Sequence, residues 1–318
     1  MSLPYAFCVE LGRVIDIVEA HEVYFSKPEG ERERLTFQCP DAKCREAAHA
    51  GITGVNYDKL PGKDKFVQKP HFRLAKDSPH ADGCPWCELV AVSDELEGDT
   101  TSPKVANLKR TELITVFKPL PETDTPNTDD DFGALRTILG IPDQTERRTR
   151  LRGFLRGNLN KTSRLHEVAR CFEVMSDDER KVTPFRIGDM ETRTYRSYFA
   201  PAKYCSNEHF WNRIYFGRAN VMRYSSGYSI RFESRSKLKD GTLCTVSVFV
   251  SKEQINGFRG KVLLRAALDD AVDMGKGAIY CYAFGDVTRA FKDGTPTNRI
   301  DIRLANLHSL AIKLNEDE

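Results

Sequence analysis

The sequence lacks the features that would place it in or across a membrane. No stretch reaches the 18 or more consecutive apolar residues that a membrane-spanning helix needs. The first residues, MSLPYAFCVELGR, do not combine a basic region with an apolar run, so we expect no secretory signal. The net charge is only +2, which excludes a chain that binds polyanions through its overall charge. We therefore expect a cytoplasmic protein without a membrane partner.

The sequence also lacks the short motifs of common enzyme classes. GxxxxGK[ST], GxSxG, HExxH and a GxGxxG after a strand are all missing. Asp269, Asp270 and Asp273 have helical spacing, and a solvated helix face explains them. We therefore name no catalytic residue and expect a protein that is not an enzyme. A metal-dependent nuclease built from distant acids and a lysine stays open, because such a site leaves no local motif.

The composition predicts a folded chain of more than one domain. Of the 318 residues, 40% are hydrophobic and 30% are charged, which is ordinary for a globular protein. At roughly 100–200 residues per domain, the length predicts two or three domains. Alternating strand patterns, helical spacings and loops all occur. We predict the α+β class, with a zinc-stabilised N-terminal module (1–118), an acidic linker (119–131), a helical basic segment (132–202) and a C-terminal OB-fold-like β-barrel (203–318).

Four of the nine cysteines lie close together in the first third of the chain. An odd number of cysteines in a chain expected to be cytoplasmic argues for a metal site and free thiols rather than a disulfide framework. The segments FQCPDAKC and KPHFRLAKDSPHADGCPWC supply Cys-x4-Cys and His-x3-Cys spacings. Structural zinc takes four N or S ligands, and a metal can replace a core that this loop-rich segment cannot build. The candidate ligands are Cys39, Cys44, Cys84 and one or both of His71 and His80.

Two questions stay open at this metal site. Cys87 can replace Cys84, since the two form a Cys-x2-Cys pair. The competing interpretation is a group of buried thiols beside a surface histidine, without any metal.

The same region resembles the N-terminal zinc-finger region of CoiA-type competence proteins. The resemblance covers about residues 8–87 and is carried by GRVIDIVEA, FQCPDAKC and KPHF. The chain departs from the family pattern in its x4 cysteine spacing and in Leu74, where the family has a second histidine. The resemblance implies a zinc finger in DNA processing, such as recombination or anti-phage defence. The family's nuclease-like domain is not evident downstream, so the resemblance implies no activity.

A short segment in the middle of the chain is strongly basic. Residues 147–170 contain eight Lys or Arg and a single acid, Glu167. Clustered cations bind nucleic acid by neutralising phosphates. The candidate contacts here are Arg148, Arg152 and Arg156. The alternatives are a solvated helix face and pairing with the acidic run at 122–131.

The last part of the chain has the element order strand–strand–strand–helix–strand–strand, which is typical of an OB-fold. Residues 203–318 contain 18 Lys or Arg and 13 Asp or Glu. In TLCTVSVFV, alternation assigns Cys244, Val246, Val248 and Val250 to the core and Phe249 to the opposite face. OB-folds bind single strands with cations and exposed aromatics, although such aromatics can equally belong to a core. The candidate binding face is Arg218, Arg231, Phe249, Tyr280, Tyr282 and Arg303.

Together these patterns predict a zinc-containing nucleic-acid-binding protein that is not an enzyme. Its expected target is single-stranded DNA or a duplex–single-strand junction. The alternative is an adaptor that binds protein partners through its zinc module and barrel.

Overall fold

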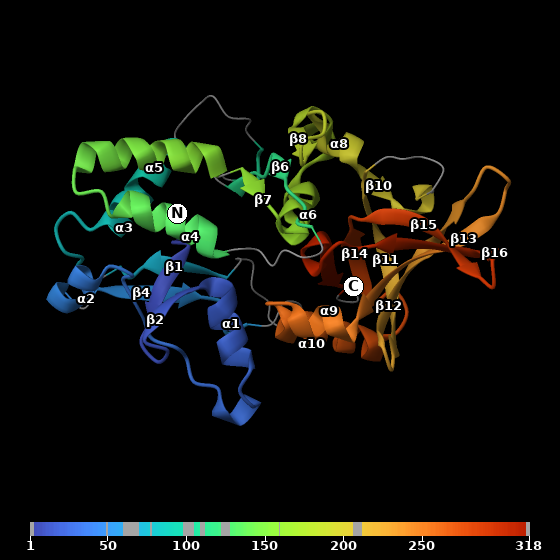
Figure 1. Cartoon of the computed structure of the whole chain (residues 1–318), viewed down its shortest axis with the longest axis horizontal. Coiled ribbons are helices and arrows are strands. Elements are labelled where there is room, and N and C mark those ends of the chain that lie inside the picture. The colour runs from blue at the N-terminus through green and yellow to red at the C-terminus, as the bar shows by residue number, and fades with distance from the viewer. Residues whose placement is uncertain are drawn as a thin grey trace. The chain divides into compact units, whose positions relative to one another are not determined.

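The computed structural model describes residues 3–48, 50–59, 70–76, 78–97, 105–108, 112–121, 128–158, 160–205 and 212–315. The chain divides into two compact units that interleave along the sequence (Figure 1). The first unit comprises Met1–Ser102, Asn127–Asn158 and Arg259–Leu263. The second comprises Pro103–Pro126, Leu159–Phe258 and Leu264–Glu318.

The first unit contains a five-stranded antiparallel sheet in the order β2-β1-β3-β4-β5. Its strands are β1 (Tyr5–Cys8), β2 (Arg13–Asp16), β3 (Phe37–Gln38), β4 (Gly51–Val55) and β5 (His71–Leu74). Phe37 packs edge-on against Tyr57 and Phe72, with ring centroids 5.2 and 4.8 Å apart. A Cβ at Gly54 would come within 2.7 Å of the Phe37 ring. Glycine at this position therefore allows the strand to approach the aromatic core.

The described part of the first unit also contains helices. They are α1 (Ile17–Phe25), α2 (Ala42–Ala48), α3 (Pro85–Glu97), α4 (Thr128–Leu139) and α5 (Gln144–Asn158), with a short 3-10 helix at Glu29–Glu31. Helix α1 begins at Asp16, whose carboxylate accepts a hydrogen bond from the backbone NH of Glu19 at 2.8 Å. Helix α5 packs against both α3 and α4 (Figure 1). It buries Leu151 and Leu155, which lie one turn apart on the same face.

A small sheet with three helices opens the second unit. The sheet order is β7-β6-β8-β9, built from β6 (Val116–Phe117), β7 (Lys161–Thr162), β8 (Pro184–Ile187) and β9 (Arg193–Thr194). The helices are α6 (Leu165–Val174), α7 (Asp177–Val182) and α8 (Tyr195–Tyr198). Apolar residues of α6 recur at helical spacing and are buried, among them Leu165, Val168 and Phe172.

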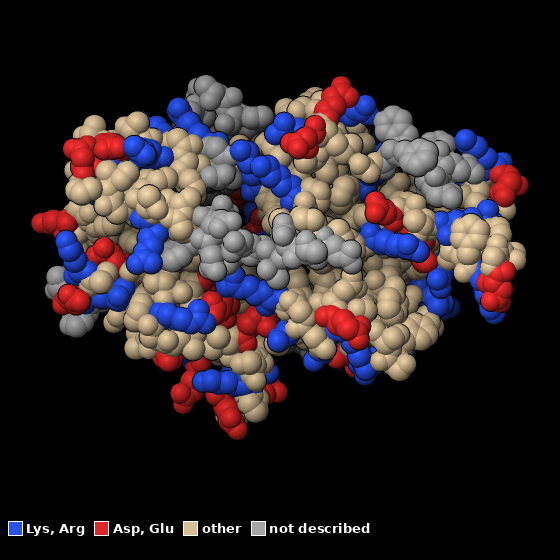
Figure 2. Space-filling view, in the orientation of Figure 1, with Lys and Arg blue, Asp and Glu red and all other residues tan. Residues whose placement is uncertain are grey.

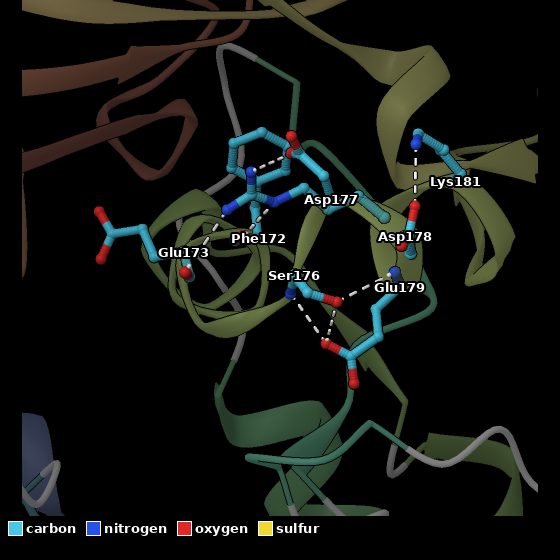
Figure 3. Close-up of polar contacts among 8 residues, drawn as sticks. Phe172, Glu173, Ser176, Asp177, Asp178, Glu179 and Lys181 are labelled. Atoms are coloured by element: carbon cyan, nitrogen blue, oxygen red, sulfur yellow. Dashed lines mark hydrogen bonds and ion pairs between the residues drawn. The ribbon is translucent and has the colours of Figure 1, made fainter.

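The junction between α6 and α7 is fixed by a capping box and an arginine (Figure 3). Ser176 accepts a hydrogen bond from the NH of Glu179, and the Glu179 carboxylate accepts one from the NH of Ser176 at 2.8 Å. Arg180 lies over the Phe172 ring, 4.2 Å from its centroid, and donates to the Phe172 carbonyl at 2.8 Å. The Glu173 carboxylate points away from these contacts, so it is left for other partners.

The second unit is built around an eight-stranded sheet. Seven strands follow the order β15-β16-β13-β12-β11-β14-β17, and β10 pairs with β11 in addition. They are β10 (Phe199–Pro201), β11 (Ile214–Tyr224), β12 (Gly227–Lys237), β13 (Leu243–Ser251), β14 (Ile279–Ala283), β15 (Asp286–Lys292), β16 (Thr295–Arg303) and β17 (Leu310–Leu314). Two pairs are parallel, β13 with β16 and β10 with β11, and the others are antiparallel. The remaining elements are α9 (Lys252–Gly257), α10 (Lys261–Met274) and 3-10 helices at Ala202–Tyr204 and Leu307–Ser309.

The two faces of this sheet have different cover. The inner face forms the main core, with Val246, Val248 and Val250 fully buried beside Leu268 and Ala271 of α10. The outer face of β14 and β17 is covered by α6, so Tyr282 belongs to a second cluster with Phe172. The predicted inward set Cys244, Val246, Val248 and Val250 is buried as expected.

The α+β class is confirmed, whereas the predicted organisation differs in detail. Residues 122–127 of the expected acidic linker lie outside the described residues, and Thr128 already begins α4. The expected helical segment 132–202 also contains short strands, and it is divided between the units at Asn158. No helix in the described ranges has the length and apolar character needed to cross a bilayer.

Candidate metal centre

Three cysteines and one histidine of the first unit converge on one point. Cys39 directly follows β3, and its NH donates to the Ala50 carbonyl at 2.8 Å. Cys44 lies in the first turn of α2, where its NH donates to the Asp41 carboxylate at 2.8 Å. His80 and Cys84 precede α3, four residues apart. The strand end and the two helix starts therefore bring together ligands that are up to 45 residues apart.

The four donor atoms all lie within 4.8 Å of one another. The Cys39 and Cys84 sulfurs are 3.7 Å apart. Nδ1 of His80 is 3.3 Å from the Cys44 sulfur and 3.7 Å from the Cys84 sulfur. The three thiols are buried, and Nε2 of His80 is buried without a hydrogen-bond partner in the described part of the chain. This Cys3His cluster can hold a metal ion.

Hydrogen bonding between the thiols identifies the sulfur that ionises first. Bonds from Cys39 and Cys87 lower the pKa of Cys84, because they stabilise its thiolate. The same bonds raise the pKa of Cys39 and of Cys87, which hold their protons as donors. Burial raises the pKa of Cys44. Metal binding at this cluster therefore requires the release of protons from Cys39 and Cys44.

The remaining candidate ligands lie outside the four-residue cluster. His71 is on β5, opposite Val55, and is half-buried. Cys87 lies in the first turn of α3 and hydrogen-bonds to Cys84. Its sulfur is not among the four donor atoms that lie within 4.8 Å of one another. The structure therefore brings together Cys39, Cys44, His80 and Cys84 and leaves His71 apart.

The predicted basic contacts on α5 are largely engaged within the first unit. Arg148 and Arg152 both pair with Glu95 of α3, and the Arg152 contact measures 2.6 Å. Arg152 and Arg148 together lower the pKa of the Glu95 carboxyl. Arg156 is exposed near the end of the helix. The Arg148 and Arg152 side chains remain 37% and 44% exposed in these pairs, so phosphate binding by α5 stays a prediction.

The deepest ion pair of this interface lies next to the metal cluster in the sequence. Nε of Arg147 donates to the Glu88 carboxylate at 2.5 Å, and both side chains are less than a tenth exposed. Nη1 of Arg147 donates to the Ile141 carbonyl at 2.7 Å. The Glu88 NH in turn donates to the Cys84 carbonyl at 3.2 Å. The first turn of α3 thus links a metal ligand to the helix interface.

The predicted aromatic face of the second unit is partly closed. Tyr282 is only 3% exposed, and its hydroxyl donates to Glu173 of α6 at 3.0 Å. Its assignment to a binding face is therefore wrong, because α6 covers this part of the sheet. Tyr280 is half-buried against Phe216 and Tyr282.

The other predicted residues of this face are open to solvent to different degrees. Phe249, Arg218 and Arg303 are exposed, and Arg231 is partly exposed. Met222 and Tyr224 are exposed as well, at 41% and 40%. Met222 and Tyr224 are four and six residues after Arg218 on the same strand, so all three side chains lie on one face of the sheet. The alternation in RIYFGRANVMRY could therefore have predicted them from the sequence.

Charge is mixed over the surface. On the face drawn in Figure 2, Lys and Arg side chains alternate with Asp and Glu in both units. Among the acids of α10, Asp269 is engaged by Arg223 and by the Tyr228 hydroxyl, the latter at 2.5 Å. Within the described ranges, the Cys3His cluster is the one grouping whose donor atoms could hold a metal.

Comparison of the chain with family models, curated proteins and solved structures found no match.

Proposed function

We propose that this protein is a zinc-containing nucleic-acid-binding protein and that the open part of its large sheet binds single-stranded DNA. The observation that carries the proposal is a pair of exposed apolar side chains, Met222 and Phe249, on the same face of β11–β13 as Arg218 and Arg231. Phe249 is 46% exposed near the end of β13, where it pairs with Ser229 of β12. Such a patch on a folded protein marks a binding surface more often than chance exposure.

The strand register arranges this patch in two neighbouring rows. Met222 is opposite Ser229, and Ser229 is opposite Phe249, which gives a row across three strands with an apolar side chain on each side of a serine. Asn220 is opposite Arg231 in the next row. Residues directly opposite each other lie about 5 Å apart, so the rows form one continuous surface. Bases can stack on the apolar row while the backbone follows the cations.

Arginines provide the charge at this surface. Arg218 is exposed and has no hydrogen bond or ion pair to any described residue. Arg231 donates to the Tyr224 hydroxyl at 2.9 Å, which holds the guanidinium beside an exposed ring. An arginine fixed beside an aromatic can contact a phosphate while a base stacks on the ring. These two cations therefore suit a single strand laid across the sheet.

The strand connections support an OB-like barrel as part of the proposal. β14 pairs with β11 and β15 pairs with β16, while only Phe284 and Gly285 separate β14 from β15. β13 runs parallel to β16. A bent strand that pairs with the first strand and then with the fifth is the connection expected of a five-stranded Greek-key barrel. In OB-folds the face of the second and third strands binds oligonucleotides, which corresponds here to β12 and β13.

Zinc is the metal that best suits the Cys3His cluster. A tetrahedral ion with Zn–S near 2.3 Å and Zn–N near 2.0 Å separates two sulfurs by about 3.8 Å and a sulfur from a nitrogen by about 3.5 Å. The 3.7 Å between Cys39 and Cys84 and the 3.3 and 3.7 Å to His80 agree with that geometry. Four protein ligands leave no open position, so we assign the ion a structural role. The resemblance of residues 8–87 to CoiA-type zinc fingers supports DNA processing or anti-phage defence as the setting.

The test is fluorescence anisotropy with labelled single-stranded and duplex oligonucleotides at two salt concentrations. We expect preferential binding of the single strand that weakens as salt rises, because phosphate contacts release counterions. Phe249→Ala should weaken binding about 5- to 150-fold, given about 1–3 kcal/mol per stacked base. Val182→Ala is the matched control, since Val182 is 74% exposed on α7 of the same unit.

Failure of this test has a definite meaning. No binding at low salt would overturn the proposal and favour the adaptor, whose apolar interface with a protein partner is insensitive to salt. Cleavage of a plasmid with Mg²⁺ or Mn²⁺ would instead favour the nuclease alternative. Each lost phosphate contact lowers the slope of log affinity against log salt concentration by about one. If Arg231→Ala leaves this slope unchanged, Arg231 does not belong to the binding surface.

A further inference from the structure

Cys87 is a fifth thiol beside the four donors of the metal centre. It lies in the first turn of α3, three residues after Cys84, in the sequence CPWC. The Cys84 sulfur accepts two hydrogen bonds from Cys87, one from its backbone NH and one from its thiol. Because a structural zinc takes four N or S ligands, the Cys3His cluster is complete without Cys87. Cys87 is therefore an uncommitted thiol that is held against a candidate ligand.

The start of α3 holds these two cysteines in a geometry that a disulfide can adopt. Cys84 occupies the N-cap position, since its carbonyl accepts a helical hydrogen bond from the NH of Glu88 at 3.2 Å. Cys87 occupies position N3, whose NH is the usual partner of an N-cap side chain. Residues three apart in a helix have Cα atoms about 5 Å apart. Disulfides span Cα separations of about 4.4–6.8 Å, so the two sulfurs can bond without a rearrangement of the backbone.

Contacts that do not involve the four donor atoms keep this turn of α3 in place. Trp86, which lies between the two cysteines in the sequence, is only 5% exposed. Glu88 directly follows Cys87 and forms the buried ion pair with Arg147 of α5. These two anchors fix the Cys84–Cys87 pair independently of the other candidate ligands.

The pair also differs from the remaining cysteines in its access to solvent. Cys87 is half-buried, whereas the other eight cysteines are buried. A small oxidant that diffuses in from solvent therefore reaches the Cys84–Cys87 pair more easily than the isolated thiols of the cores. A cysteine at a helix N-terminus with a second cysteine poised beside it is the arrangement typical of redox-sensitive thiols.

We propose that Cys84 and Cys87 are a site of oxidation by hydrogen peroxide, and that their disulfide withdraws Cys84 from the metal centre. The Cys84 thiolate attacks one peroxide oxygen, the O–O bond breaks, and a sulfenic acid and a hydroxide form. The hydroxide takes the proton of the Cys87 thiol. The Cys87 sulfur then attacks the Cys84 sulfur, and the S–O bond breaks to release a second hydroxide. Two electrons pass from the two sulfurs to the peroxide, which ends as one water and one hydroxide.

The disulfide changes the number of ligands at the metal centre. Cys39, Cys44 and His80 remain, which is one ligand fewer than a structural zinc takes. Oxidation should therefore release the ion, and reduction of the disulfide should restore the site. The inference goes beyond DNA binding and rests on the proposed function only through its zinc.

The experiment treats the full-length protein, loaded with Zn²⁺, with hydrogen peroxide. Free thiols are then blocked, and trypsin releases residues 77–104, which contain both cysteines, separately from residues 35–43, which contain Cys39. We expect mass spectrometry to find peptide 77–104 unblocked and lighter by two hydrogen atoms. A colorimetric zinc chelator should report zinc release in step with this disulfide, and a dithiol reductant should reverse it.

Two variants complete the experiment. Cys87→Ser should bind zinc as the wild type does, because Cys87 is not a ligand, but it should lose both the disulfide and the zinc release at the same peroxide dose. Cys244→Ala is the matched control and should behave as the wild type, since it removes a buried thiol on β13 of the second unit.

Each outcome bears on a stated part of the proposal. A disulfide that joins peptide 77–104 to peptide 35–43 would overturn it, because Cys39 would then be the partner of Cys84. Equal zinc release in the wild type and Cys87→Ser would overturn the link between the disulfide and the metal, and failure of Cys87→Ser to bind zinc would make Cys87 a ligand. Absence of zinc from the wild-type protein would overturn the zinc assignment, whereas peptide 77–104 would still decide whether the disulfide forms. Absence of DNA binding would overturn the single-strand proposal alone.

Discussion

The buried histidine of helix α1 makes the stability of the first unit depend on pH. His21 is 2% exposed, and its Nδ1 donates to the Tyr57 carbonyl at 2.5 Å. Its Nε2 is buried without a partner in the described residues. Burial lowers the pKa of His21 from 6.5 to about 4, although the Tyr57 carbonyl and Asp58 both favour the charged form. Protonation would place a charged NH where no acceptor meets it.

The magnitude follows from linkage. A group whose pKa is lower in the folded state than in the unfolded state contributes stability above the unfolded value, and that stability is lost as pH falls toward the folded value. A shift from 6.5 to about 4 corresponds to about 3 kcal/mol. The free energy of unfolding of the first unit should therefore fall by about that amount between pH 6.5 and pH 4, and His21 should add no further loss below pH 4.

The assay is hydrogen exchange of the amides of β1–β4 across this pH range, in the wild-type protein and in His21→Gln. Glutamine can still donate to the Tyr57 carbonyl but does not titrate. Protonation of the metal ligands affects both proteins equally, so the difference between them isolates His21. Parallel pH profiles for the two proteins would refute the reasoning.

Three further predictions test the cluster and its surroundings. Cys44→Ser should lower the amount of metal that copurifies, measured by mass spectrometry, whereas His71→Gln should leave it unchanged; equal metal in both variants would remove Cys44 from the site. Arg147→Met should destabilise the first unit by about 3–5 kcal/mol in denaturant unfolding, because it leaves Glu88 buried and unpaired, and a second change of Glu88→Leu should recover much of the loss. Gly285→Ala should lower the melting temperature of the second unit, since its Cβ would lie 2.1 Å from the Arg303 carbonyl oxygen; an unchanged melting temperature would show that the backbone there can move.

Local spacing predicted much of the metal cluster. Cys-x4-Cys places one ligand at the end of β3 and one in the first turn of α2, and His80 lies one turn before Cys84. The choice between His71 and His80 needed the fold, because it depends on the pairing of β5 with β4. Sequence spacing cannot report that pairing.

Alternation predicted which residues of the large sheet share a face but not what covers that face. It correctly grouped Tyr280 with Tyr282, yet α6 lies over them through Glu173, which is 109 residues from Tyr282. The same limit applies to α5, where Glu95 is 57 residues from Arg152. Charge clusters and face assignments are local properties, whereas their partners are set by tertiary packing.

The discontinuity of the first unit sets the order in which it can mature during synthesis. The chain emerges from its N-terminus, so Cys39, Cys44, His80 and Cys84 are all available before α5 exists. Until Arg147 follows, Glu88 lacks the arginine that pairs with it in the folded unit. The four residues that could hold a metal are therefore all synthesised before α3 meets its ion-pair partner. A fragment that ends at residue 118 would contain all four candidate ligands but would lack Arg147, the ion-pair partner of Glu88.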